Sequence, residues 1–390
     1  MVRVLSFSSA FMMPTIVGYW RSFGMGMSEV MWLQAIFATT LALSETPSGY
    51  IADVLQRRTS VIISSVCFFS GGLLYLLADS FAMFVAVEVA LAFGCAFMSG
   101  ADSALLTESV RQLGGDRMEE LRWRSKVITS GFRGGAVMLC LGGLLNWVDP
   151  RYPIWAEIVG YGLLVLAASS LREPLRVKKV RTASHLREFL SVGRYALIDN
   201  GQIRWVLLAS GMCLTLDFTG LWLYQPLFEQ SGLEPWFYGP LFAVFALVAA
   251  QGSKWAHRIG QRSDSFRVLV LPLALSTFTM LILGLSESNT AWLALFVLQL
   301  GRGTREVFSE QLLNAEVETG YRATVLSLQS MTARFPYAIA LSIVGTWMGV
   351  HGMGATFLFL GIVGLVSIGA LLWFEPQKRR RKEELSRMAV

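Results

Sequence analysis

Long apolar runs recur along the whole chain, and they constrain its fold more than any other feature. Many exceed 18 residues, which is enough for a helix to cross a bilayer. A backbone inside lipid must satisfy its own hydrogen bonds, so only helices or a closed β-barrel can span a membrane. These runs are continuous, whereas barrel strands alternate in polarity. The sequence therefore predicts an all-α integral membrane protein.

Twelve spans can be drawn, and the longest polar segment, 172–203, divides them into six and six. The expected spans are 4–21, 28–52, 59–78, 82–110, 124–147, 154–171, 204–226, 236–257, 267–286, 290–317, 322–349 and 354–374. We expect 4–21 to be a retained first span, because no small-residue cleavage site of a signal peptide follows it. The predicted domains are an N-terminal six-helix bundle (1–171), a cytoplasmic linker (172–203), a C-terminal six-helix bundle (204–374) and a basic cytoplasmic tail (375–390).

The net charge of +6 is unevenly distributed along the chain. Lys and Arg concentrate in the even-numbered connections and in the tail, which is the distribution of cytoplasmic segments in a multi-pass membrane protein. Both termini are therefore expected in the cytoplasm. This pattern also argues against nucleic-acid binding, which needs a continuous basic face. The linker has two interpretations, a surface helix on an anionic leaflet and a solvated connection.

The two halves resemble each other weakly. GYIADVLQRRT after the second span has a counterpart in KWAHRIGQRS (254–263) after the eighth span. ADSALLTES in the fourth span is similar to FSEQLLNAE in the tenth. Such repeats are typical of secondary transporters.

The segment from Gly49 to Arg58, GYIADVLQRR, resembles the G-x-x-x-D-[RK]-x-G-[RK]-[RK] loop signature of the major facilitator superfamily. Gly49, Asp53, Arg57 and Arg58 match it, whereas Val54 and Gln56 differ. The resemblance implies two pseudo-symmetric six-helix bundles around a central cavity in a monomeric transporter, located in the cytoplasmic (inner) membrane of a prokaryote. It also implies that the four matching residues form a conformational latch, while the arginines by themselves fit the positive-inside rule.

Ionisable residues inside membrane spans are costly and mark functional sites by default. Asp217 is the first candidate for proton binding, because its surroundings, LTLDFTGLW, offer no cation nearby in the sequence. The full set of candidates for substrate or proton binding is Asp217, Asp102, Glu45, Arg133 and Arg302, with Trp222 and Tyr224 as pocket residues. We expect an internal charge network among Glu108, Arg305, Glu306 and Glu310, at the cytoplasmic ends of the spans.

The glycine-rich fifth span is similar to the G-P-x-x-G-G motif of drug/proton antiporters, with Leu139 at the position of the proline. The chain contains no GxxxxGK[ST] segment, so an ion gradient rather than ATP is the expected energy source, without a cofactor. The four cysteines and three histidines have no metal-ligand spacing.

Together these features predict a proton-coupled transporter that exports a small amphipathic molecule across the membrane by alternating access. The alternative is a proton symporter that imports an anionic nutrient or a metal chelate, with Arg133 and Arg302 binding the anion. A membrane-embedded enzyme would need a catalytic His/Asp cluster, which the isolated histidines do not supply. A receptor or scaffold on a transporter fold stays open, because a fold alone does not set function.

Overall fold

The computed structural model describes residues 2–6, 10–54, 56–174, 191–260, 266–317 and 322–374. Within these residues the chain is helical and contains no strand, which confirms the predicted all-α fold. The α-helices are α1 (Val2–Leu5), α2 (Ile16–Ser22), α3 (Met27–Val54), α4 (Arg57–Leu77), α5 (Phe81–Met98), α6 (Ala101–Gln112), α7 (Arg117–Val148), α8 (Tyr152–Ser169), α10 (Gly201–Leu221), α11 (Tyr224–Gln230), α12 (Pro235–Gly260), α13 (Val270–Leu285), α14 (Leu295–Glu316) and α15 (Arg322–Trp373).

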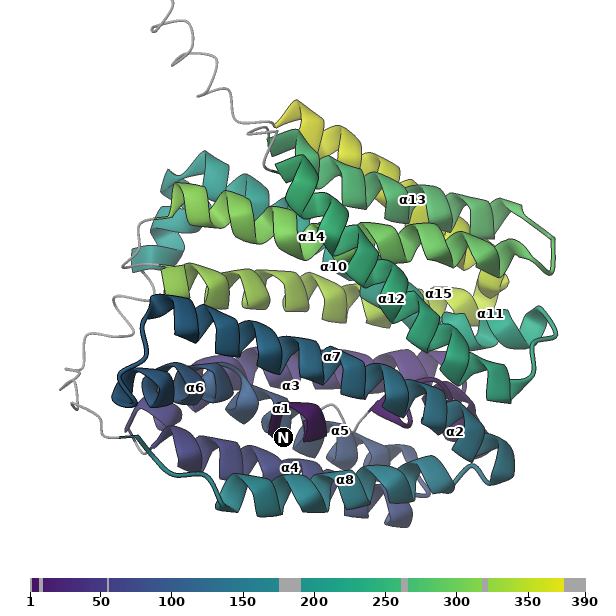
Figure 1. Cartoon of the computed structure of the whole chain (residues 1–390). Coiled ribbons are helices and arrows are strands. Elements are labelled where there is room, and N and C mark those ends of the chain that lie inside the picture. Colours follow the sequence, from purple (N-terminus) through teal and green to yellow (C-terminus); the bar gives the residue numbers. More distant parts are fainter. Residues whose placement is uncertain are drawn as a thin grey trace, which may run out of the picture.

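The helices form two bundles that lie side by side (Figure 1). Helices α1–α8, purple to blue, make the first bundle, and α10–α15, teal to yellow, make the second. Helix α3 packs along α15, and α7 packs along α12, so these two pairs join the bundles. We call the end that carries the connection between α8 and α10 the linker end, and the opposite end the far end. The expected linker and tail fall largely on 175–190 and 375–390, outside the described residues.

The first span differs from the continuous helix that we expected over 4–21. Turns occupy residues 11–15, between α1 and α2. The side chain of Glu157 on α8 accepts a hydrogen bond from the Met12 backbone N–H at 2.9 Å. Pro14 follows closely, and a proline cannot donate the backbone hydrogen bond that continues a helix. A buried carboxylate from another helix therefore stabilises the interruption.

Two other predicted spans and one predicted connection also contain a bend or break. Gly100 has a φ of 77°, a conformation that favours glycine, and it separates α5 from α6. Gly352 has a φ of 78° and divides the long helix α15 at the far end. Helices α10 and α11 meet at an angle of 42°. The break at Gly100 and the bend between α10 and α11 interrupt predicted spans. Gly352 lies in the connection predicted between 322–349 and 354–374.

Six helices of the described residues are long and apolar enough to cross a membrane, or seven if α10 and α11 count as one span. The other predicted spans contain short helices, as in α2 and α13, or many polar residues, as in α14. The membrane character of the chain therefore agrees with the sequence, and the number of twelve spans stays a prediction.

Candidate functional site

A buried carboxylate, Asp217, lies in the core of the second bundle. Helix α10 places this side chain against α13 and α14, and the residue is only 2% exposed. Ser276 on α13 donates a hydrogen bond of 2.5 Å to its Oδ1. The Nε atom of Arg305 on α14 lies 3.8 Å from its Oδ2. Among the described residues, no donor forms a hydrogen bond with Oδ2, so this oxygen can accept a proton or a new hydrogen bond.

The structure separates the expected charge network. Arg305 contacts Asp217 and, through its NH2 group, Glu306 at 3.4 Å. Glu306 and Glu310 are exposed on α14. Glu108 belongs to the first bundle instead, where its Oε1 lies 3.0 Å from Nε of Arg57. The expectation that Glu108 joins Arg305 was wrong, because these residues lie in different bundles and each finds an opposite charge within its own.

A second polar group continues from Asp217 along α14. Arg302 donates a 3.4 Å hydrogen bond to Gln299, which in turn donates a 3.1 Å hydrogen bond to the hydroxyl of Tyr224. The guanidinium of Arg302 also lies 5.6 Å from the ring centroid of Phe218, the neighbour of Asp217 in sequence. Cation–π contact of this kind stabilises a positive charge in apolar surroundings. The arrangement therefore combines a cation, an amide and aromatic rings in one place.

Trp222 lies where the two bundles meet. Its indole N–H donates a 2.7 Å hydrogen bond to the hydroxyl of Tyr337 on α15. Its ring lies 5.9 Å from that of Trp20 on α2, in the other bundle. Trp222 and Tyr224 are both buried, so they contribute packing and hydrogen bonds near Asp217 rather than an open wall.

Glu45 is the other candidate that meets an opposite charge. Its Oε1 lies 3.2 Å from Arg334 and accepts a 2.9 Å hydrogen bond from Ser330, both on α15. Because Glu45 is on α3, this ion pair joins the two bundles. Both bundles therefore hold a carboxylate that contacts one serine and one arginine.

Asp102 and Arg133 lie on two other helices of the first bundle. Asp102 lies in the first turn of α6, where its Oδ1 accepts a 2.7 Å hydrogen bond from the Ser103 backbone N–H. A carboxylate at that position stabilises the start of a helix. Arg133 is exposed on α7.

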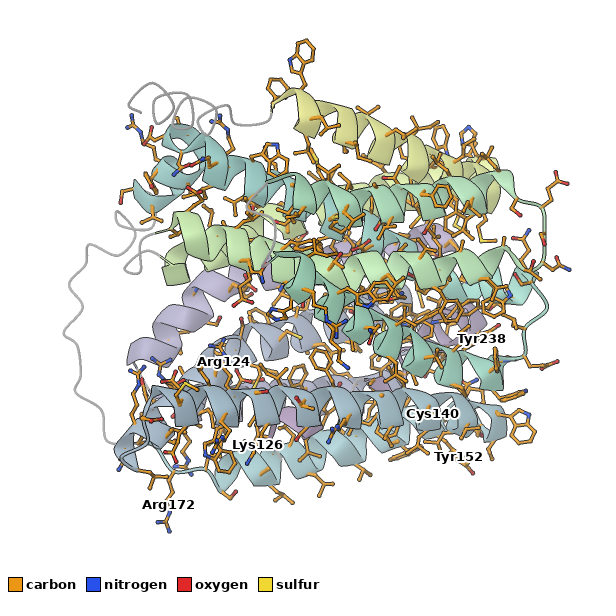
Figure 2. All side chains as sticks on the ribbon, turned by 45° about the horizontal axis from the view of Figure 1, so that its top comes forward. Arg124, Lys126, Cys140, Tyr152, Arg172 and Tyr238 are labelled. Atoms are coloured by element: carbon orange, nitrogen blue, oxygen red, sulfur yellow. The ribbon has the colours of Figure 1, made fainter. Side chains whose placement is uncertain are left out.

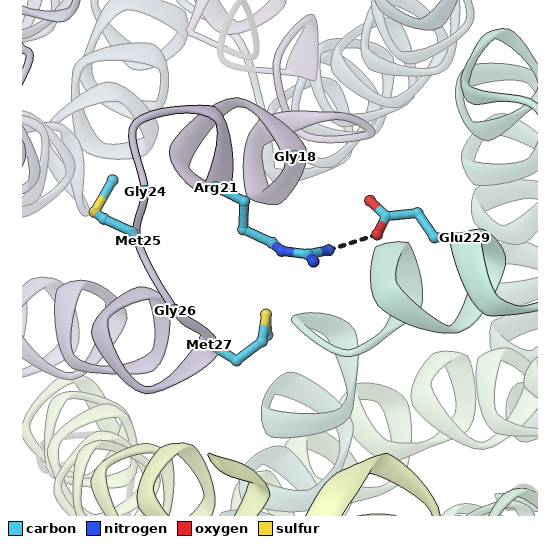
Figure 3. A pocket seen from close by; sticks show the side chains of 7 residues that line it. All are labelled: Gly18, Arg21, Gly24, Met25, Gly26, Met27 and Glu229. Atoms are coloured by element: carbon cyan, nitrogen blue, oxygen red, sulfur yellow. Dashed lines mark hydrogen bonds and ion pairs between the residues drawn. The ribbon is translucent and has the colours of Figure 1, made fainter.

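The far end of the molecule is closed by contacts between the bundles. Arg21 of α2 forms an ion pair with Glu229 of α11 across a cavity of about 490 Å³ (Figure 3). The backbone N–H of Gly18 donates a 3.1 Å hydrogen bond to Gln225 of α11. Gly143 of α7 meets Gly239 of α12 so closely that a Cβ on Gly143 would lie 2.6 Å from the Gly239 nitrogen.

At the linker end the helices α7 and α12 separate (Figure 1). Residues 121–130 of α7 are exposed on all sides apart from Val127. Figure 2 places Arg124 and Lys126 on this half of α7 and Cys140 on the other half, which crosses α12. Helices α7 and α12 are therefore in contact at the far end and diverge toward the linker end.

Residues 2–340 match the sequence profile of the family described as Major Facilitator Superfamily. The chain belongs to this superfamily. The predicted membrane transporter, as opposed to an enzyme, is thereby confirmed at the level of the family.

The chain is also similar, at low sequence identity, to proteins named as transporters. "Sugar transporter ERD6-like 8" from Arabidopsis thaliana is 26% identical over an alignment of 278 residues, and the match covers 64% of this chain. The chain spans 59% of the length of that relative. Among solved structures, the nucleoside transporter NupG gives a TM-score of 0.76 at 12% identity, with 96% of this chain and 98% of NupG covered. The D-xylose-proton symporter gives 0.74 at 13% identity, with 96% of both chains covered. These structures share the fold.

The superfamily loop signature lies in an ionic cluster at the linker end. Glu173 accepts hydrogen bonds from the backbone N–H groups of Arg57 at 3.0 Å and Arg58 at 2.8 Å, so it caps α4 from a distance in sequence. The guanidinium of Arg58 donates a 2.8 Å hydrogen bond to the Ser169 carbonyl at the end of α8. The surroundings of Gly49 and the side chain of Asp53 lie outside what the structure describes, so the latch expected for them stays a prediction.

Three ionisable residues that were not among the predicted site residues are buried or paired in the structure: Glu88, Glu157 and Arg334. Glu88 and Glu157 are 3% and 4% exposed in the first bundle. Arg334 forms the ion pair with Glu45. Each interrupts an apolar run, as in FVAVEVALA and PIWAEIVGY, so the rule that selected Asp217 also selects them.

Proposed function

We propose that the protein is a proton-coupled secondary active transporter that exports a small amphipathic molecule in exchange for protons. The observation that carries this proposal is the Asp217 carboxylate, which is buried, incompletely hydrogen-bonded and 3.8 Å from Arg305. Protonation of such a carboxylate removes its attraction for the arginine, whereas ionisation restores it. Proton binding and the position of Arg305 are therefore linked.

The orientation follows the distribution of Lys and Arg, which assigns the linker end to the cytoplasm. With that orientation, the protein in this state is closed to the outside and faces inward. A substrate then enters from the cytoplasm between α7 and α12 and meets Arg302, Gln299 and Phe218. When Asp217 takes up a proton, Arg305 loses its attraction for Asp217 and keeps its contact with Glu306 at 3.4 Å, and this loss of a partner accompanies the change of conformation.

The gradient of protons supplies the energy in this proposal, and one chain contains both bundles that the cycle needs. Import by proton symport is the second candidate. It is supported by the sequence similarity to a sugar transporter and by the fold shared with a proton symporter. Arg302 would then bind an anionic or hydroxylated substrate, and Arg133 of α7 would be the second arginine that binds the anion.

The test measures proton exchange with purified protein in weakly buffered detergent, using a pH indicator dye. The added probes are tetraphenylphosphonium, D-xylose, uridine and a neutral dipeptide. Asp217→Asn is compared with Asp199→Asn, which removes an exposed carboxylate at the start of the same bundle. We expect a bound probe to release protons from the native protein and from Asp199→Asn, but not from Asp217→Asn.

Proton uptake on binding would favour symport over antiport. Binding of a probe without proton release or uptake in the native protein would rule out proton coupling through Asp217. Proteoliposomes with an imposed pH gradient then determine the direction of net transport for each probe that binds.

A further inference from the structure

Glu88 is a buried carboxylate in the first bundle that the proposed cycle does not use. It lies on α5, about 10 Å from the far end of that helix at 1.5 Å per residue. The Tyr75 hydroxyl donates a 3.0 Å hydrogen bond to its Oε1, and the Gln34 amide donates a 3.2 Å hydrogen bond to its Oε2. Both oxygens are therefore held, and both donors are neutral.

No cation balances this carboxylate among the described residues, because none of the ion pairs there includes Glu88. Glu88 acts electrostatically on Tyr75 of α4, Cys95 of α5, Glu157 of α8 and Tyr337 of α15. Arg334 of α15 also acts on Cys95 and Tyr337, but its ion pair is with Glu45. Gln34, from α3, is neutral. A buried carboxylate without a counter-ion is costly in its charged form, because desolvation is not repaid by attraction. The surroundings in this state therefore fit the neutral acid.

Helix α2 separates this site from the far side of the molecule. The Tyr19 ring of α2 lies 6.3 Å from the Tyr75 ring and 6.2 Å from that of Phe84, and its hydroxyl donates a 3.5 Å hydrogen bond to the Tyr75 carbonyl. The next residue, Trp20, is fully buried against Trp222 of the second bundle. The cover over Glu88 is thus attached to the opposite bundle.

When the bundles separate at the far end, the contacts that hold α2 to α11 must break. Gly18, Trp20 and Arg21 all contact the second bundle, so α2 moves relative to one bundle or the other. Water that enters along α2 then reaches Tyr75 and Glu88. In the present state the same path is closed by packed aromatic rings.

We propose that Glu88 is a second proton-binding site of the transport cycle, which exchanges its proton with the far side when α2 uncovers it and must be protonated again before the far end closes. This inference rests on the proposed proton coupling. In the step, the O–H bond of the Glu88 acid breaks and an entering water molecule takes the proton. The carboxylate that remains keeps the hydrogen bonds from Tyr75 and Gln34 and gains solvation. The far end closes again once the carboxylate has taken a proton back.

The sign of the coupling follows from this step. The neutral acid favours the closed far end, and the carboxylate favours the open one. Glu88→Gln keeps the shape and stays neutral at every pH, so this variant is expected to hold the far end closed. Asp79→Asn is the matched control, because Asp79 is an exposed carboxylate between α4 and α5 in the same bundle.

Two measurements on the purified full-length protein in detergent test the proposal. Infrared spectroscopy during a pH titration detects the C=O band of a buried carboxylic acid. We expect one such band to be lost in Glu88→Gln, kept in Asp79→Asn, and shifted in Tyr75→Phe, which removes one donor but keeps the acid. A spectrum of Glu88→Gln that equals the native spectrum would overturn the proposal, as would an unmoved band in Tyr75→Phe.

Hydrogen–deuterium exchange gives the second measurement. After correction for intrinsic exchange rates, the native protein and Asp79→Asn are expected to exchange several-fold faster in α2 and α11 at alkaline than at acidic pH. Glu88→Gln is expected to lose this difference. A difference that persists in Glu88→Gln would overturn the proposal. These readouts do not use transport, so a native protein that fails to transport with a pH gradient refutes only the proposed function.

Discussion

Arg21 and Glu229 form an ion pair that joins α2 to α11, and thereby the first bundle to the second, at the far end. The two side chains are 43% and 40% exposed, and they face each other across the cavity in Figure 3. An exposed ion pair stabilises a structure by about 1 kcal/mol or less. Its effect is therefore expected on the balance between open and closed states rather than on folding.

Reversal of one charge in this pair should open the far end. Arg21→Glu places two carboxylates together, so the closed state loses an attraction and gains a repulsion. The double variant Arg21→Glu, Glu229→Arg should restore closure. Met25 lines the cavity and is 6% exposed, so the added substitution Met25→Cys reports whether the far end is open. The measured quantity is the rate at which a membrane-impermeant maleimide labels this cysteine. Equal labelling in the single and double variants would show that the pair does not control closure.

The glycine crossing between α7 and α12 should tolerate no side chain. A Cβ on Gly143 would lie 2.6 Å from the Gly239 nitrogen, so Gly143→Ala must push the helices apart. Overpacking typically costs about 1–3 kcal/mol. We expect this cost to lower the ratio of closed to open far end by the corresponding factor. Met25→Cys should then be labelled faster in the Gly143→Ala variant. Gly369→Ala is the control, because no atom lies within 4 Å of its added Cβ.

Ser276 should stabilise the protein through Asp217. Ser276→Ala removes the donor to Oδ1 and leaves both carboxylate oxygens without a hydrogen bond, which costs about 1–3 kcal/mol. Thermal unfolding in detergent should show a lower Tm than for Ser367→Ala, which removes a half-buried hydroxyl that donates to the Val363 carbonyl of its own helix. In an Asp217→Asn background the same change should cost less, because the two residues act through one contact. Additive effects would mean that Ser276 acts independently of Asp217.

Glu157 should maintain the interruption of the first span. Glu157→Leu leaves the Met12 N–H without its acceptor and should lower the stability by about 1–3 kcal/mol. Glu157→Gln keeps an acceptor oxygen at the same place and should unfold near the native temperature. Thermal unfolding of both variants measures this difference. A Gln variant as unstable as the Leu variant would show that the negative charge, not the hydrogen bond, matters.

Much of the architecture could be predicted from the sequence, because continuous apolar runs report membrane helices directly. The burial of Asp217 follows from the same rule. The partners of the ionisable residues could not be predicted, since Glu45 meets Arg334 and Asp217 meets Arg305 through contacts between residues far apart in the chain. Grouping Glu108 with Arg305 by position along the spans therefore failed.

The break in the first span shows the same limit. Its apolar sequence predicts a helix, whereas the hydrogen bond from Met12 to Glu157, 145 residues away, stabilises turns. The local sequence pattern indicates the secondary structure that a segment favours by itself. It does not indicate that a distant helix will place a buried hydrogen-bond acceptor, here the Glu157 carboxylate, beside that segment.

That break makes α2 a separate unit of seven residues, about 10 Å long. This short helix carries Gly18, Trp20 and Arg21, which are three of the links between the bundles at the far end. The smallest moving part of the closure is thus far smaller than a six-helix bundle. A pivot of α2 about the turns at 11–15 breaks all three contacts together. The far end then opens by the movement of this one short helix, before the two bundles rotate relative to each other.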